Sequence, residues 1–147
     1  MWTVRLDLPS TIESVHLLDA LISEMLNLMQ IDEQISHQIN LAVIEAGTNA
    51  IKHGNAADPE KYVHFEFQAS SEKMTILVQD SGCLNQHKLQ ESPSLVETEL
   101  DNLTRSDGRG LQLIDAYMDE VIYDIASVKM VKRIKNWVEN SLSTNHY

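Results

Sequence analysis

The sequence has 147 residues, of which 43% are hydrophobic, enough for one packed domain but too little for two independent cores. Its 22 acidic residues outnumber its 11 basic ones and give a formal net charge of −11, which would repel a phosphate backbone or an anionic membrane. We therefore expect no direct nucleic-acid partner and no membrane partner. The lone Cys83 cannot form an internal disulfide, and we find no leader-like segment or apolar run of about 20 residues, so we expect a cytoplasmic protein.

The first half of the sequence predicts a strand followed by two helices. Residues 2–8 alternate between apolar and polar types, as in a half-buried strand. Ser10 predicts the N-cap of the first helix, with Glu13 at capping-box spacing. The second helix is expected to begin near Asp32 and to end at residues 53–55, where glycine and asparagine are typical of a helix C-terminus.

The second half predicts four strands and one helix, with strands at 63–67, 74–78, 120–125 and 128–134 and the helix at 111–118. Residues 83–107 form a long polar stretch with little periodicity, which we expect to be a lid over a functional site. We place the domain at 1–135 and expect a polar C-terminal tail at 136–147. Because two helices precede the middle strands, the order differs from strict β-α-β alternation and indicates an α+β fold.

Four polar residues on the second predicted helix form the first candidate site. Glu45, Asn49 and His53 are spaced four residues apart, and Lys52 lies three beyond Asn49, so they share one face of an α-helix. The amide oxygen of Asn49 suits a hard cation such as Mg²⁺, and the Glu45 carboxylate can position or deprotonate a hydroxyl or water. The alternative is an ordinary solvated helix face that ends in a favourable cap.

The second candidate site is Asp80-Ser81-Gly82, which follows the most apolar predicted strand. A carboxylate at this position can accept a hydrogen bond from an exocyclic amine such as that of adenine, and Gly82 lets the backbone approach a flat base. A turn of this composition at a strand end also forms without any ligand.

The third candidate site runs from Arg105 to Leu111 and opens the last predicted helix. Gly108 and Gly110 let successive backbone amides face an anion, and the helix N-terminus adds positive partial charge, so a triphosphate fits this segment. Arg105 and Arg109 can add phosphate contacts, although Arg109 as a merely solvated residue is the alternative. The segment lacks the Gly-Lys-Ser/Thr ending of a Walker loop and the third glycine of a dinucleotide fingerprint.

The three sites together resemble a known set of motifs. Glu45-x-x-x-Asn49-x-x-Lys52-His53, Asp80-x-Gly82 and Gly108-x-Gly110-Leu111, in this order, resemble the N, G1 and G2 boxes of the GHKL (histidine-kinase-like) ATPase superfamily. The segments EAGTNAIKHGN and GRGLQLIDAYMDEV most resemble its anti-sigma-factor serine/threonine-protein kinase branch. The resemblance implies a two-layer α/β sandwich of the Bergerat type, with about three helices on a mixed, mainly antiparallel five-stranded sheet and ATP beneath a lid.

The same resemblance implies a role for each matched residue. Asn49 would be the Mg²⁺ ligand, Glu45 the general base and Asp80 the residue that reads adenine. The other residues expected to bind the nucleotide are Lys52, His53, Gly82, Arg105, Gly108, Arg109, Gly110 and Leu111.

By this resemblance we expect a serine/threonine-protein kinase of a partner-switching system that uses ATP and Mg²⁺. It would phosphorylate a STAS-domain anti-anti-sigma factor and sequester a sigma factor or another regulatory protein, and it would form a homodimer. The alternatives are an ATP-dependent partner-switching module without phosphotransfer and a domain that has lost nucleotide binding. Glu45 separates the kinase from the module, because only phosphotransfer needs a general base.

Overall fold

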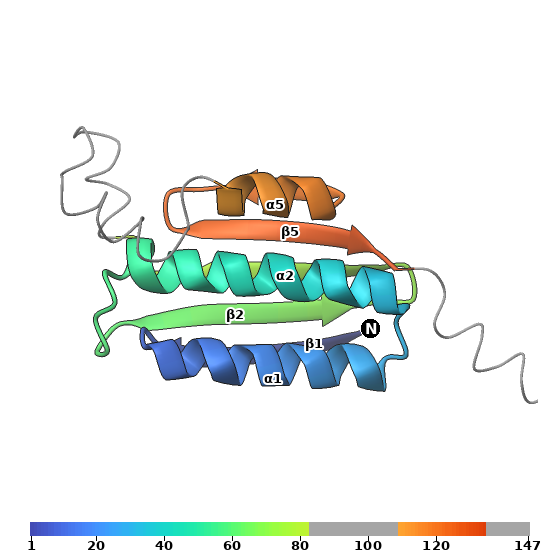
Figure 1. The fold of residues 1–147 in the computed structure, drawn as a ribbon, viewed down its shortest axis with the longest axis horizontal. Coiled ribbons are helices and arrows are strands. Elements are labelled where there is room, and N and C mark those ends of the chain that lie inside the picture. Colours follow the sequence, from blue (N-terminus) through green and yellow to red (C-terminus); the bar gives the residue numbers. More distant parts are fainter. Residues whose placement is uncertain (83–108, 135–147) are drawn as a thin grey trace, which may run out of the picture.

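The computed structural model describes residues 1–82 and 109–134, with the backbone alone for 109–111, and these residues form two layers. One layer is a five-stranded sheet in the order β1-β2-β3-β5-β4, and the other consists of α1, α2 and α5 on one face of it (Figure 1). The elements are β1 (Trp2–Pro9), α1 (Ile12–Leu28), α2 (Glu33–Asn49), η1 (Ala50–Gly54), β2 (Tyr62–Ala69), β3 (Lys73–Gln79), α5 (Arg109–Tyr117), β4 (Glu120–Tyr123) and β5 (Ser127–Arg133). This confirms the expected α+β sandwich, whereas the expected lid at 83–107 and tail at 136–147 lie outside the described residues.

The sheet is antiparallel throughout its described strands, where the resemblance implied a mixed, mainly antiparallel one. β3 and β4 run in the same direction, because each of them is antiparallel to β5. They would form a parallel pair if they were neighbours. β5 lies between them instead, so the crossover through α5 adds no parallel pair to the sheet.

The hydrophobic core lies between the sheet and the helices. On β2, Val63, Phe65 and Phe67 alternate with polar residues, and none of the three is more than 1% exposed. The two phenylalanine rings stack with their centroids 6.4 Å apart. Leu18 of α1 and Val43 of α2 belong to the same buried cluster. Because each such side chain stabilises the fold by roughly 1.5–3 kcal/mol when buried, the alternation on β2 decides which face of the sheet the helices cover.

The first helix does not begin as predicted. Thr11 occupies the N-cap position of α1 without a side-chain cap, so the expected capping box of Ser10 and Glu13 is not formed. The Ser10 hydroxyl is buried and instead donates to the carbonyl oxygen of Lys61 at 2.7 Å. The second helix does begin near Asp32, as predicted, and the Asp32 carboxylate caps it by accepting hydrogen bonds from two backbone amides of the first turn at 3.1 and 3.4 Å.

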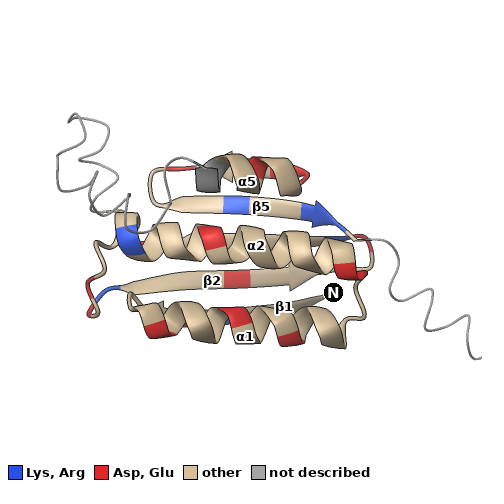
Figure 2. Ribbon diagram, viewed as in Figure 1, with Lys and Arg blue, Asp and Glu red and all other residues tan. Residues whose placement is uncertain are grey.

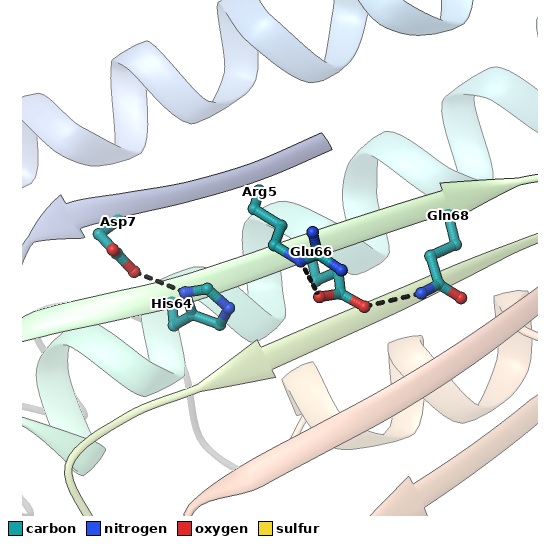
Figure 3. Close-up of polar contacts among 5 residues, drawn as sticks. All are labelled: Arg5, Asp7, His64, Glu66 and Gln68. Atoms are coloured by element: carbon teal, nitrogen blue, oxygen red, sulfur yellow. Dashed lines mark hydrogen bonds and ion pairs between the residues drawn. The ribbon is translucent and has the colours of Figure 1, made fainter. Parts of the chain in front are cut away.

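The other face of the sheet carries polar pairs that join β1 to β2. Arg5 lies directly across from Glu66, and Asp7 lies across from His64. Arg5 Nε donates to Glu66 Oε2 at 2.6 Å, Gln68 donates to the other oxygen at 2.8 Å, and His64 Nδ1 lies 2.5 Å from Asp7 Oδ1 (Figure 3). The hydrogen bond from Arg5 is the main cause that lowers the pKa of Glu66. These cross-strand pairs favour the observed register of the edge strand β1.

Candidate nucleotide site

The helix that carries the first candidate site widens at its end. Asn49 is the last α-helical residue of α2, and Ala50–Gly54 form the π-helical turn η1. The backbone N–H of Asn55 donates to the first carbonyl of η1, five residues back, at 2.9 Å. Turns of this kind are frequent at functional sites. The α-helical spacing on which the prediction depended therefore holds up to Asn49 and not for Lys52 and His53, which lie in η1.

Glu45 and Asn49 lie one turn apart on α2, and both are half-buried. Burial disfavours the charged carboxylate and raises the pKa of Glu45, while the positive charge of Lys52 opposes this shift. A carboxylate with a raised pKa binds a proton more readily than an exposed one. The position of Glu45 therefore suits a proton acceptor.

Asp80 lies directly after β3 and against the end of η1. A Cβ atom at Gly54 would lie 2.0 Å from Asp80 Oδ2, so the carboxylate has room there because Gly54 lacks a side chain. Asp80 Oδ1 accepts a hydrogen bond from the backbone N–H of Gly82 at 2.7 Å, and Gly82 has a φ of +74°, which favours glycine. Burial raises the pKa of Asp80, and the hydrogen bond from Gly82 opposes this shift. The structure thus places Asp80 against Gly54, the residue that follows His53 of the first candidate site.

A metal ion in this region would depend on few protein ligands. The described part of the chain contains no group of three or more His, Cys, Asp or Glu side chains that could hold a metal ion. A divalent cation held by the amide oxygen of Asn49 would share further oxygen ligands with phosphates and water. This is how Mg²⁺ is usually held in phosphotransfer sites, because it keeps several waters and shares substrate phosphates. Asn49, with Glu45 one turn away, fits that donor set.

The third candidate site lies partly within the described residues. α5 begins at Arg109, so Gly110 and Leu111 belong to its first turn, whereas Arg105 and Gly108 lie outside them. α5 packs along α2, and its first turn lies at the same end of the helix layer as η1 (Figure 1). The first turn of a helix has unpaired backbone N–H groups and a positive partial charge, both of which suit a phosphate.

The distribution of charge also distinguishes this end of the molecule. Acidic residues are spread along α1 and α2, whereas a basic residue lies where α2 passes into η1 (Figure 2). This residue is Lys52, which places a positive charge close to the end of η1 that contacts Asp80. Lys52 thus offers a positive charge to an anionic ligand in a region that also contains the carboxyl groups of Glu45 and Asp80.

Asn55 lies at the predicted helix end and closes the segment EAGTNAIKHGN, but the motifs assign it no role. It is completely buried, and its side chain forms hydrogen bonds with Ser10, Tyr62 and Ser81. An asparagine after a helix-ending glycine is typical of an exposed turn, so the sequence did not predict that Asn55 is buried.

The fold and the motifs together define a nucleotide-binding domain of the two-layer α+β class. The chain belongs to the histidine kinase-like ATPase domain family, whose model matches residues 8–134. None of the helices in the described ranges is long and apolar enough to cross a membrane.

Comparison with curated proteins finds relatives with two names. The chain is 30% identical over 148 residues to the serine-protein kinase RsbW of Listeria innocua, across 95% of this chain and 94% of that protein. It is 34% identical over 94 residues to the anti-sigma F factor of Clostridium perfringens, across 63% of this chain and 66% of that protein. The match thus spans slightly less than two thirds of the anti-sigma F factor.

A solved structure has the same fold. The crystal structure of the RsbU and RsbW domains of a Mycobacterium tuberculosis protein matches with a TM-score of 0.61 at 16% identity. The match covers 92% of this chain and 33% of that one.

Proposed function

We propose that this chain is an ATP-dependent serine/threonine-protein kinase of a partner-switching system. Its substrate is a serine or threonine of a STAS-domain anti-anti-sigma factor, and it also sequesters a sigma factor or another regulatory protein. The names of the relatives support this proposal, since they include serine-protein kinases and anti-sigma F factors. The observation that carries it is Glu45, a half-buried carboxylate with a raised pKa, one turn from Asn49.

In this proposal, ATP lies across the end of the helix layer where the candidate sites meet. The amino group of adenine donates a hydrogen bond to Asp80, and Gly82 leaves room for the base. The phosphates extend toward the first turn of α5, where backbone N–H groups face them. The remaining residues proposed to contribute to phosphate binding are Lys52, His53, Arg105, Gly108, Arg109, Gly110 and Leu111.

The proposed reaction uses Glu45 as the general base. The carboxylate accepts the proton of the partner's hydroxyl while the hydroxyl oxygen bonds to the γ-phosphorus of ATP. The bond between that phosphorus and the bridging oxygen breaks, and ADP leaves with the bonding electrons. Asn49 would hold Mg²⁺, which would neutralise charge on the phosphate oxygens. After the phosphoryl group has been transferred, Glu45 releases the proton to water.

Phosphotransfer from labelled ATP tests the role of Glu45. With Mg²⁺ and a STAS-domain protein encoded near this one in its genome, we expect Glu45→Gln to lower the initial rate by roughly 100-fold or more. ATP affinity, measured by calorimetry, is expected to change little. Glu33→Gln is the matched control, because Glu33 lies exposed at the other end of α2 and should leave the rate unchanged.

Two results would contradict the proposal in different ways. Equal rates for the wild type and Glu45→Gln would show that Glu45 is not the base. Binding of ATP without labelling of any STAS-domain protein would favour the partner-switching module without phosphotransfer.

The proposal also includes a cytoplasmic homodimer. Analytical ultracentrifugation of the purified chain tests the oligomeric state, since a homodimer has twice the mass of one chain. A single-chain mass at every concentration tested would contradict it.

A further inference from the structure

Asn55 uses all the hydrogen-bonding capacity of its side chain although it is 0% exposed. Its Nδ2 group donates to Ser10 Oγ at 2.9 Å and to the carbonyl oxygen of Tyr62 at 3.1 Å. Its Oδ1 atom accepts from the backbone N–H of Ser81 at 2.9 Å and from Ser81 Oγ at 2.7 Å. A carboxamide offers two donor hydrogens and two acceptor sites, so each of them has a partner. Asn55 thereby ties the end of β1 and the start of β2 to the residue that follows Asp80.

Asp80 is held by hydrogen bonds of its own N–H, of its carboxylate and of the residue that follows it. Its own N–H donates to the carbonyl oxygen of Ala126 at 2.8 Å, while Asn55 holds the next residue through both the main chain and the side chain of Ser81. The N–H of Gly82 then engages Asp80 Oδ1, which leaves Oδ2 directed over Gly54. Asn55 accepts its two hydrogen bonds from Ser81 with a side-chain oxygen, so substitution of Asn55 removes them, whereas the Ala126 carbonyl and the Gly82 N–H belong to the backbone.

We propose that Asn55 is a positioning residue that directs the Asp80 carboxylate and thereby sets the preference for adenine over other purines. This inference rests on the proposed function, in which Asp80 accepts a hydrogen bond from the adenine amino group. Hypoxanthine has a carbonyl oxygen where adenine has that amino group, and a carboxylate repels it. The ratio of the Kd for ITP to the Kd for ATP therefore reports whether the Asp80 carboxylate is oriented toward the base.

The test measures both dissociation constants by calorimetry with Mg²⁺ in the full chain. Ser81→Ala removes one bond to Asn55 Oδ1 at an exposed residue, so the variant should fold normally. We expect it to lower the ITP-to-ATP ratio of Kd values by roughly three- to tenfold, the range of one hydrogen bond. Asn55→Ala removes both hydrogen bonds to Ser81. If this variant folds, we expect it to lower the ITP-to-ATP ratio of Kd values further than Ser81→Ala does.

Asn40→Ala is the matched control for a purely structural effect. Asn40 also uses its Nδ2 group for two hydrogen bonds, to Asp19 and Ser23, but it lies on α2 and these bonds join α2 to α1. We expect this variant to lose stability and to keep the wild-type ratio of Kd values.

The possible failures are distinguishable. An unchanged ratio in Ser81→Ala, together with a ratio that collapses in Asp80→Asn, would overturn the role of Asn55 and leave the role of Asp80 intact. An unchanged ratio in Asp80→Asn would overturn the proposed adenine recognition, and the inference about Asn55 with it.

Discussion

Gly54 and Asp80 are far apart in the sequence, and the Asp80 carboxylate occupies the space that a side chain at position 54 would fill. A Cβ atom at Gly54 would lie 2.0 Å from Oδ2 and 2.2 Å from Cγ of Asp80. A larger residue at position 54 would therefore change the direction of the Asp80 carboxylate.

Gly54→Ala should consequently damage the nucleotide site. We expect the added methyl group to displace the Asp80 side chain, to weaken ATP binding by about tenfold or more and to lower the free energy of unfolding by about 1–3 kcal/mol. Calorimetric titration and urea unfolding measure the two effects.

Gly47→Ala is the matched control for this prediction. Its Cβ would lie 2.7 Å from Leu18 Cδ2, the end of a flexible core side chain, and its next nearest atoms belong to Phe65 and not to Asp80. We expect reduced stability with unchanged ATP affinity. Wild-type affinity in Gly54→Ala would show that its contact with Asp80 does not govern binding.

The raised pKa of Glu45 predicts a pH dependence of stability with a definite sign. Between the ordinary value of 4.5 and the raised folded value, the folded chain binds more protons at Glu45 than the unfolded chain does. The contribution of Glu45 to stability is therefore present below about pH 4.5 and is lost as the pH rises through the folded pKa. We expect the free energy of unfolding of the wild type, relative to Glu45→Gln, to fall across this window. Urea unfolding at a series of pH values checks this, and a rising difference would contradict it.

Asn49→Ala should act on binding that depends on the metal. We expect it to weaken ATP binding by roughly tenfold or more with Mg²⁺ present, because the amide oxygen is the protein's proposed ligand to the cation. Binding measured in EDTA should change much less. Asn40→Ala, on the same helix, is the control and should bind Mg²⁺-ATP normally. Equal losses with Mg²⁺ and with EDTA would argue for a structural role of Asn49.

The two long helices should differ in their sensitivity at the N-cap. Asp32→Ala removes two hydrogen bonds to backbone amides of α2 and is expected to lower the free energy of unfolding by about 1 kcal/mol. The Thr11 hydroxyl caps no backbone amide of α1 and contacts only the Ser14 hydroxyl, at 3.2 Å, among the described hydrogen bonds. We therefore expect Thr11→Ala to cost less than Asp32→Ala in urea unfolding. The reverse order would contradict the observed caps.

Periodicity alone was sufficient to predict the elements that form the core. Phe65 and Phe67 alternate with polar residues on β2, and Val43 recurs at helical spacing on α2, so the buried face of each element follows from the local sequence. The start of α2 near Asp32 was likewise predictable, because the amides that Asp32 caps lie within the next turn of the chain.

Features that depend on distant contacts were not predictable in this way. Ser10 has the spacing of a cap, but its hydroxyl bonds to Lys61 and Asn55 instead, and neither partner is near it in the sequence. The π-helical turn after Asn49 and the contact between Gly54 and Asp80 arise where a helix end meets a strand end. The motifs thus select the residues of the candidate site, and the packing of the chain decides how Asp80 is oriented within it.

The placement of β5 between β3 and β4 has a consequence for how the protein is made. Until β5 pairs with it, β3 has one unpaired edge, and the Asp80 N–H lacks the Ala126 carbonyl as its acceptor. A ribosome-bound chain that has emerged only as far as β4 therefore has an open sheet edge beside the proposed adenine site. We expect a nascent chain to acquire its affinity for nucleotide only after residues 127–133 have left the exit tunnel.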